Sequence, residues 1–269
     1  MRDAEWLGVF RSLGRRAGRA AGRLYGTKTG RRELGRGAAG DTTVFLDRAL
    51  EKLVIGTVRR AGNVRLISEE AGVMDFGEPE VCIIADPLDG SVNAKAGVPF
   101  FSVSYALAPL EPRMADVRVG YVRNLVSGDE YWAFKGGGAF KNGKRIRASN
   151  QSTIELLLME LSPGHRKALR VSRGLLEQTA RVRCLGSVAL DFCLVASGVA
   201  SALVDFRGGL LRTLDQCAGK LILEEAGGLV TDESGGTIDH LSVDLTTRTD
   251  IIAAANRRVL DRVVRARWG

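Results

Sequence analysis

The stretch Val81–Ser91, which reads VCIIADPLDGS, decides how the rest of the chain is organised. In it an apolar run leads directly into a carboxylate, Asp86, and Pro87 follows. Such a run predicts a buried strand that ends at Asp86, because proline lacks the amide N–H that a central strand donates. The second carboxylate, Asp89, then lies in a turn. We expect both carboxylates to converge at an edge of the sheet, where open α/β folds bind their ligands.

Two carboxylates held close together repel each other, and a divalent cation removes that repulsion. A ligand set made only of oxygen atoms is typical of Mg²⁺, which in turn binds substrate phosphates. Gly90 allows the backbone to approach a ligand closely, and Ser91 is expected to cap a helix whose N-terminus attracts an anion. An acidic surface turn without any ligand is the alternative interpretation of these residues.

Two other regions supply acidic residues in comparable places. The segment Val64–Ser68 predicts a short strand that ends at Glu69, which could complete a metal site with the acidic turn. Asp215 is expected in the first turn of a helix over Leu214–Glu225, where the helix dipole favours a negative charge. Asp47 is expected on a helix near the N-terminus. Taken alone, the three are also explained as a surface turn, a capping residue and a solvated acid.

Composition describes a globular protein of 269 residues, with 45% hydrophobic residues and a mean hydropathy near zero. No apolar run approaches the roughly 20 residues that a membrane-spanning helix needs. The N-terminus lacks the apolar segment of a signal peptide, so we expect a cytoplasmic protein with no membrane partner. Four cysteines without metal-binding spacing predict buried free thiols, and two histidines leave little scope for a zinc site or a histidine base.

The net charge of +8 suits two different classes of partner. A basic field can bind nucleic acid, and it can also gather phosphorylated substrates around an enzyme. The basic residues are spread along the chain, and aromatic residues make up only 6% of it. This pattern favours an enzyme and no nucleic-acid partner, since a nucleic-acid-binding surface would cluster its arginines with interleaved aromatic residues.

The N-terminal part of the chain predicts two helices joined by a loop. Residues 1–25 carry an apolar stripe at helical spacing, and a helix packed on its own domain is favoured over one bound to a membrane surface. Gly26–Gly40 is rich in glycine and basic residues and predicts a mobile loop that closes over a bound phosphate. Asp41 is expected to cap the second helix.

The pattern of elements changes near Ser149. Before it, from Phe100 to Phe140, alternating strands and tight turns predict an antiparallel meander. After it, strands and helices alternate, including one helix over Arg166–Leu176. We therefore expect an α+β N-terminal domain at 1–148 that binds the metal, and an α/β C-terminal domain at 149–269 that completes the active site.

Several motifs together resemble the inositol monophosphatase family. They are DPLDGSVN at 86–93, preceded by Ser68-Glu69-Glu70, and LDQCAG at 214–219; GDTTVFLDRALE at 40–51, GSVALDFCLVASG at 186–198 and EEAGGLVTDESGG at 224–236 extend the match over nearly the whole chain. The family includes archaeal enzymes that act on both inositol monophosphates and fructose 1,6-bisphosphate. The resemblance implies an α/β fold layered as an α-β-α-β-α sandwich, a homodimer or homotetramer, Mg²⁺ dependence and inhibition by Li⁺.

The resemblance also implies a set of metal ligands. By the family motif, Glu69, Asp86 and the backbone carbonyl of Leu88 hold one metal ion. Asp86, Asp89 and Asp215 hold a second, and a third, weaker site is expected near Glu69. Two metal ions would neutralise a phosphate monoester, lower the pKa of a bound water and stabilise the leaving alkoxide, so no histidine or covalent nucleophile is required.

The catalytic and substrate-binding residues follow from the same motifs. Glu69, Asp47 and Ser91 are implied to be catalytic, with Asp47 and Ser91 orienting the attacking water. The implied substrate contacts are Gly90, Ser91, Gly186, Ser187, Val188, Asp205 and Arg207. Ser91 stands where the family more often has threonine, which also supplies a hydroxyl. Asp205 lies ten residues before Asp215, a longer gap than the family pattern, so its register in the pocket is left open.

The predicted function is therefore a Mg²⁺-dependent phosphomonoesterase. Inositol 1-phosphate and fructose 1,6-bisphosphate are close competitors as substrates, and Arg207 is the candidate to bind the second phosphate of the bisphosphate. A phosphatase for 3′-phosphoadenosine 5′-phosphate or another sugar phosphate is an alternative, although the sequence offers no evident aromatic platform for adenine. A basic nucleic-acid-binding protein is the alternative outside the enzymes.

Overall fold

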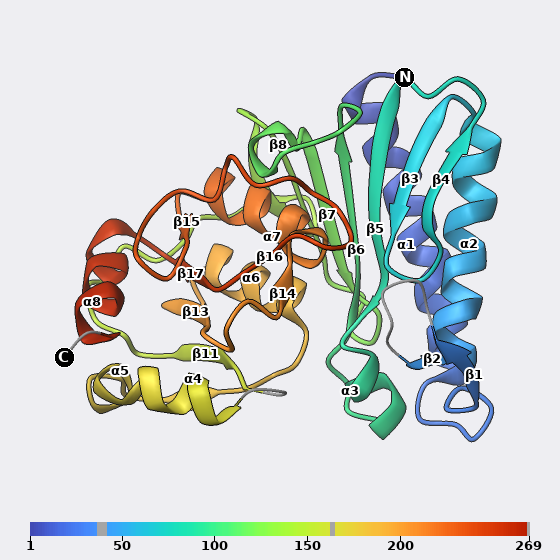
Figure 1. Cartoon of the computed structure of the whole chain (residues 1–269). Helices are drawn as coiled ribbons and strands as arrows, with labels where there is room; N and C mark the ends of the chain where they lie inside the picture. Colours follow the sequence, from blue (N-terminus) through green and yellow to red (C-terminus); the bar gives the residue numbers. More distant parts are fainter. Residues whose placement is uncertain (37–41, 162–164, 268–269) are drawn as a thin grey trace.

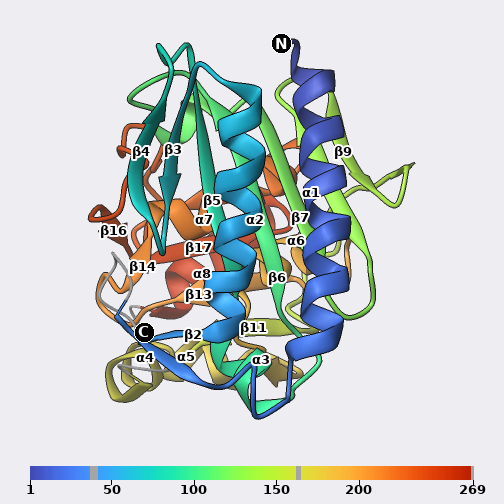
Figure 2. The same ribbon diagram turned by 90° about the vertical axis from the view of Figure 1, so that its right-hand side faces the viewer.

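A computed structural model describes residues 1–36, 42–161 and 165–267 of the chain. Its elements form five layers, a mixed α/β architecture that Figures 1 and 2 show from two directions. The expected α-β-α-β-α sandwich is confirmed. The longer helices are α1 (Asp3–Leu24), α2 (Phe45–Ala61), α6 (Val188–Ala196), α7 (Thr213–Glu225) and α8 (Arg257–Arg267); the shorter ones are α3 (Ser91–Ala96), α4 (His165–Val171), α5 (Arg173–Glu177) and a 3₁₀ turn, η1 (Met114–Asp116).

The first sheet has eight strands in the order β10-β9-β8-β7-β6-β5-β3-β4, and α1 and α2 cover its outer face (Figure 2). Its strands are β3 (Val64–Ser68), β4 (Gly72–Phe76), β5 (Val81–Asp89), β6 (Ser102–Ala108), β7 (Val119–Asn124), β8 (Glu130–Phe134), β9 (Gly138–Lys141) and β10 (Lys144–Arg145). Its neighbouring strands are antiparallel except for β3 and β5, which run parallel with Ser68 opposite Ala85. This parallel pair brings the acidic ends of both strands to one place.

The expected end of β5 at Asp86 is wrong, because the strand continues through Pro87 to Asp89. Against β6, Asp86 pairs with Ser104 and Asp89 with Ser102, so the strand accommodates one extra residue between these pairs. Such a bulge tolerates a proline, since the extra residue leaves a position unpaired in the ladder. Leu88 instead donates its N–H to Asp86 Oδ1 at 2.9 Å.

The second sheet has five strands in the order β12-β11-β13-β17-β15. They are β11 (Leu157–Glu160), β12 (Val182–Arg183), β13 (Ala202–Asp205), β15 (Leu229–Thr231) and β17 (Ile251–Ala254). Helices α6 and α7 fill the space between the two sheets, and α4, α5 and α8 lie on the far side of the second sheet (Figure 1). The largest core cluster draws buried residues from both sheets and from α6 and α7. The division into domains at 1–148 and 149–269 stays a prediction.

The region after α1 differs from the expected mobile loop. Residues Glu33–Arg36 form β1, which pairs antiparallel with β2 (Thr42–Val44), so only part of Gly26–Gly40 lacks regular structure. Helix α2 begins later than expected, at Phe45, because the residues before it pair with β1 instead. The expected cap at Asp41 lies outside the described residues, and closure of this segment over a phosphate stays a prediction.

Other expectations changed in smaller ways. The single helix over Arg166–Leu176 is two helices, α4 and α5, that meet at the fully buried Ser172. A further two-stranded sheet was not expected: β14 (Leu211–Arg212), directly before α7, pairs with β16 (Arg248–Thr249). Three cysteines are buried free thiols as predicted, but Cys184 is exposed. Within the described ranges, no helix is both long and apolar enough to cross a membrane.

Candidate active site

A cavity of about 550 Å³ is lined by the end of β5, the start of α7 and loops of the C-terminal half. Most of the expected site residues line it: Asp47, Glu69, Asp86, Leu88, Asp89, Gly90, Ser91, Gly186, Val188, Arg207 and Asp215. Ser187 and Asp205 do not line it, and both are fully buried. The predicted residues therefore gather around one cavity, and Ser187 and Asp205 lie behind its wall.

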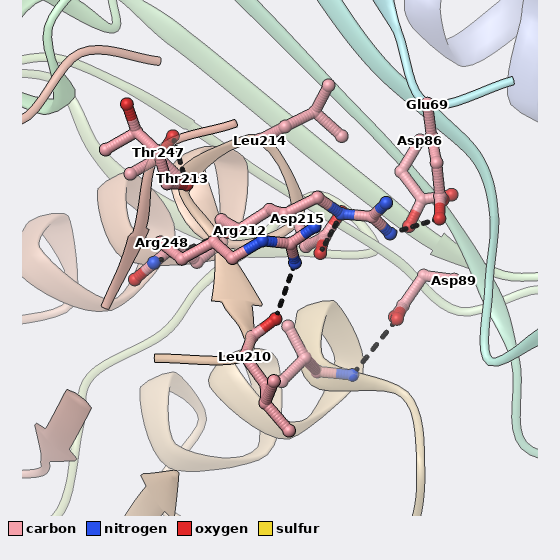
Figure 3. Close-up of polar contacts among 12 residues, drawn as sticks. Glu69, Asp86, Asp89, Leu210, Arg212, Thr213, Leu214, Asp215, Thr247 and Arg248 are labelled. Atoms are coloured by element: carbon pink, nitrogen blue, oxygen red, sulfur yellow. Dashed lines mark hydrogen bonds and ion pairs between the residues drawn. The ribbon is translucent and has the colours of Figure 1, made fainter. Parts of the chain in front are cut away.

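Three carboxylates converge in this cavity from three elements (Figure 3). Glu69 follows β3, Asp86 lies on β5, and Asp215 lies in the first turn of α7 as expected. One oxygen from each lies within 4.8 Å of the others. Asp86 is buried and the other two are half-buried, so this group combines close like charges with limited contact with water.

The electrostatics of the three carboxylates favour a bound cation. Burial, and then the nearby Asp215, raise the pKa of Glu69 to about 8, although Arg212 opposes the shift. Burial, and then Glu69, hold the pKa of Asp86 well above its ordinary value. The enclosed Oδ1 of Asp215 has no hydrogen-bond partner among the described residues. These oxygens suit a hard divalent cation, which would supply the missing positive charge.

An arginine that the sequence did not single out lies among the carboxylates. Arg212 is 8% exposed and forms ion pairs with Glu69 and with Asp215, the latter at 3.1 Å (Figure 3). Among the described residues, Arg212 is therefore a counter-ion that pairs directly with two members of the cluster. Its position three residues before Asp215, at the start of a helix, was a weak signal. The contact with Glu69, 143 residues away in sequence, left no local signal at all.

Asp89 is surrounded by hydrogen-bond donors. Its carboxylate accepts the N–H groups of Val188 and Ala189 at 3.1 and 3.0 Å, the hydroxyl of Ser102 at 3.0 Å, and the hydroxyl of Ser187. It thereby caps α6, while burial, opposed by the two serine hydroxyls, raises its pKa to about 6. Asp89 also lines the cavity, and its role as a ligand of a second metal stays a prediction.

The turn after β5 depends on glycine. Gly90 has a φ of 86°, and a Cβ atom there would lie 2.9 Å from the carbonyl oxygen of Gly186. Only glycine fits this close approach without strain. Gly90 precedes α3 and Ser91 is its first residue, with no side-chain capping bond, so the expectation that Ser91 caps the helix is wrong.

The expected polyol contact at Asp205 does not reach the cavity. Arg207 donates hydrogen bonds to the Asp205 carboxylate from Nε at 2.9 Å and from Nη2 at 2.5 Å. Its backbone N–H donates to the same carboxylate at 3.1 Å. Arg207 itself lines the cavity, as does Arg248, whose Nη1 donates to the carbonyl of Leu210 at 2.9 Å (Figure 3). Glu160 also lines the cavity and was not expected there.

Comparisons with known proteins agree with this geometry. The family model described as "Inositol monophosphatase family" matches residues 3–269. A fructose-1,6-bisphosphatase/inositol-1-monophosphatase from Methanothermobacter thermautotrophicus is 37% identical, covering 96% of this chain and 95% of that protein. A bifunctional NADP phosphatase/NAD kinase from Methanococcus maripaludis is 32% identical, over 81% of this chain and 41% of that protein.

The fold comparison points the same way. The crystal structure of an inositol monophosphatase-fructose 1,6-bisphosphatase, the MJ0109 gene product, superposes with a TM-score of 0.85 and 26% identity, covering 99% of this chain and 100% of the other. The family is metal-dependent, and the three carboxylates form a group suited to a metal ion. With a family match over nearly its whole length, the chain belongs to the inositol monophosphatase family and is a phosphoric monoester hydrolase.

Proposed function

We propose that the protein is a Mg²⁺-dependent phosphomonoesterase that hydrolyses inositol 1-phosphate and also fructose 1,6-bisphosphate. The observation that carries this proposal is the convergence of Glu69, Asp86 and Asp215 within 4.8 Å in a polar cavity. Among the described residues that line this cavity there is no histidine or cysteine, so the acids present are carboxyls. Such a site suits hydrolysis by a metal-activated water better than covalent catalysis.

Two observations favour Mg²⁺ at this site. The donor set consists of carboxylates, and the Oδ1 of Asp215 lacks a partner within the described chain, although Arg212 forms ion pairs with two of the three groups. Glu69, Asp86 and the carbonyl of Leu88 would hold one ion, and Asp86, Asp89 and Asp215 a second. When bound, the ions lower the pKa of a water molecule and neutralise the phosphate.

The other residues of the cavity position the reactants. Asp47, buried on the first turn of α2, and Ser91, at the start of α3, would orient the attacking water. Gly90 keeps the backbone open at the point where the phosphate would approach the amides of the turn. This arrangement supplies orientation and charge neutralisation, which account for most of the rate enhancement in phosphoryl transfer.

Three arginines support a substrate that carries a second anion. Arg207, Arg212 and Arg248 all line the cavity, and the chain carries a net charge of +8. Arg212 is engaged with the acidic cluster and Arg207 with Asp205, whereas Arg248 is exposed and donates to a carbonyl. Arg207 and Arg248 are therefore the candidates to bind the second phosphate of fructose 1,6-bisphosphate.

The decisive experiment is phosphate release from a panel of phosphomonoesters with and without Mg²⁺. Replacing Asp86→Asn removes the ligand shared by both proposed ions, so we expect more than about 90% of turnover to be lost, a barrier increase above ~1.4 kcal/mol. The matched control is Asp75→Asn, which changes a surface carboxylate paired with Arg65. Retention of turnover by Asp86→Asn, or equal rates without Mg²⁺, would refute the two-metal proposal.

A nucleotide substrate is the second candidate, favoured by the similarity to the NADP phosphatase/NAD kinase. No aromatic residue is among the described residues that line the cavity, so an adenine ring would lack a stacking partner there. The panel therefore includes NADP and 3′-phosphoadenosine 5′-phosphate. Inhibition by Li⁺, a dimeric or tetrameric state and a cytoplasmic location belong to the same proposal, and the first two are checked by Li⁺ titration and by light scattering.

A further inference from the structure

A second pair of carboxyl groups lies behind the wall of the cavity. Glu160, the last residue of β11, lines the cavity and is only 8% exposed. Asp191, in the first turn of α6, is fully buried. The two side chains interact with each other, and neither contributes to the cluster of Glu69, Asp86 and Asp215.

Three of the four carboxyl oxygens of this pair have no hydrogen-bond partner within the described part of the chain. Oε1 of Glu160 and both carboxyl oxygens of Asp191 are enclosed without a hydrogen-bond partner. Burial raises the pKa of Glu160 to about 7 even though Arg207 opposes the shift, and burial together with Glu160 raises the pKa of Asp191 well above its ordinary value. Two carboxyls in contact satisfy each other only when they share a proton, so the pair carries at most one negative charge.

Glu160 and Asp205 differ in what their carboxyl groups contact, although the strand register places them side by side. In the parallel pair of β11 and β13, Glu160 lies beside Asp205, so both occupy equivalent positions on neighbouring strands. Arg207 occupies the carboxylate of Asp205 with two guanidinium contacts and its backbone N–H. Among the described residues, Oε1 of Glu160 has no hydrogen-bond partner, and the Glu160 side chain borders the open space of the cavity.

We propose that Glu160 is a specificity residue that binds a hydroxyl group of a polyol or sugar substrate, and that Asp191 is the residue that positions it. A carboxyl pair holding one proton can both accept and donate a hydrogen bond, and a hydroxyl has the same dual capacity. An anionic group would be repelled by the pair, so this part of the cavity selects hydroxyls and the arginines select the second phosphate. The inference rests on the proposed phosphatase function.

The test compares two substrates that differ in their hydroxyl groups. Inositol 1-phosphate carries ring hydroxyls, whereas phenyl phosphate offers none, and both present the same phosphate to the acidic cluster. For Glu160→Ala, we expect the ratio of kcat/KM for inositol 1-phosphate to that for phenyl phosphate to fall about tenfold or more, the scale of a lost hydrogen bond to a charged group. The loss should appear chiefly as a higher KM for inositol 1-phosphate.

The control variant is Glu155→Ala. Glu155 precedes the same strand, is exposed and does not line the cavity, so its removal changes the net charge equally and should leave the ratio of the two substrates unchanged. If Glu160→Ala does not fold, Glu160→Gln retains the size of the side chain and should lower the same ratio by a smaller factor. An unchanged ratio in the folded variant, or an equal fall for both substrates, overturns the inference.

Asp191 has its own diagnostic. Asp191→Ala should lower the ratio of kcat/KM for inositol 1-phosphate to that for phenyl phosphate, because Glu160 loses its hydrogen-bond partner. Asp191→Asn should keep this ratio near the wild-type value, because the amide donates a permanent hydrogen bond to Glu160. Equal ratios in the two variants would refute a positioning role. Failure of the wild-type protein to release phosphate from any substrate would instead refute the proposed function, so the two failures are distinguishable.

Discussion

At the scale of single residues, the most informative one is Arg212. Its guanidinium lies between Glu69 and Asp215, so two of the three converging carboxylates have a counter-ion within the chain. Breaking a buried ion pair from one side leaves an uncompensated charge, which costs more than the intact pair contributes. Arg212 therefore bears directly on how the metal-free protein tolerates its acidic cluster.

We expect Arg212→Met to destabilise the metal-free protein by about 3 kcal/mol, because Glu69 and Asp215 lose their cation. Added Mg²⁺ should reduce the difference in unfolding free energy between the variant and the wild type, since the ion replaces the lost positive charge. The measurement is denaturant unfolding with and without Mg²⁺. The control Arg65→Met removes a more exposed ion pair with Asp75 and should cost no more than about 1 kcal/mol. Equal costs for the two variants would contradict the role of Arg212.

Glu51, which is not itself a proposed metal ligand, predicts a pH dependence of stability. It is buried, accepts a hydrogen bond from Ser68 Oγ at 2.8 Å, and burial raises its pKa from 4.5 to about 7. The folded protein thus binds this proton more tightly than the unfolded chain. The associated stability is complete below about pH 4.5 and is lost as the pH rises through about 7.

Glu51→Gln removes the titrating carboxyl proton. It keeps a side-chain oxygen that can accept the hydrogen bond from the Ser68 hydroxyl. Relative to the wild type, we expect the variant to gain stability between pH 5 and pH 8, by up to about 3 kcal/mol. Urea unfolding of both metal-free proteins at the two pH values measures the difference. A gap between them that does not change with pH would show that Glu51 is not protonated in the folded state.

At the scale of elements, α7 depends on close contacts with its neighbours. A Cβ atom at Gly120 on β7 would lie 2.7 Å from the carbonyl oxygen of Ala218, and one at Gly219 would lie 2.7 Å from Cβ of Phe192 on α6. Glycine at these two positions lets α7 pack tightly between the first sheet and α6. Because α7 carries Asp215, this packing also sets the position of the acidic cluster.

Gly120→Ala tests that packing. The added methyl meets backbone that cannot move without shifting α7, so we expect a loss of about 1–3 kcal/mol in stability and weaker Mg²⁺ binding. Gly56→Ala is the control, because a Cβ at Gly56 in α2 meets only Arg60 Nη1, at 3.9 Å. It should be neutral or stabilise by up to about 1 kcal/mol, as alanine favours a helix interior. Calorimetry and Mg²⁺ titration give both quantities.

Local patterns predicted elements well where periodicity and burial agree. The buried strand that begins at Val81, the amphipathic α1 and the helix that carries Asp215 follow directly from their apolar spacing. They failed where tertiary contacts override local preference: Thr42–Val44 joins a hairpin, and β5 passes through Pro87 by a bulge. Glu160 and Arg212 were missed for a related reason, since their roles arise from partners distant in sequence.

At the scale of the whole molecule, the two halves share one core. The largest cluster joins Ile84 and Val122 of the first sheet to Phe192 of α6 and to Leu203 and Ala253 of the second sheet. The contact between the two halves of the chain is therefore part of one continuous hydrophobic core. The active site repeats the pattern, because its acids come from both halves of the chain.

We therefore expect one cooperative unfolding transition for the full chain. The calorimetric enthalpy should equal the van't Hoff enthalpy, because neither half can expose its share of the core without disrupting the other. A chain that ends at Ser149 should fail to give a cooperative transition of its own. Two resolved transitions, or an independently stable N-terminal fragment, would instead support two autonomous domains at 1–148 and 149–269.

The placement of α6 and α7 against the first sheet has a consequence for the nascent chain during synthesis. Synthesis completes all eight strands of that sheet by Arg145, while the helices that cover its inner face arrive only with residues 188–225. During that interval the apolar inner face of the sheet is exposed on the nascent chain. Glu69 and Asp86 have been synthesised, but Arg212 has not. Chains that stall in this window should aggregate or be held by chaperones, because the inner face of the first sheet is still exposed.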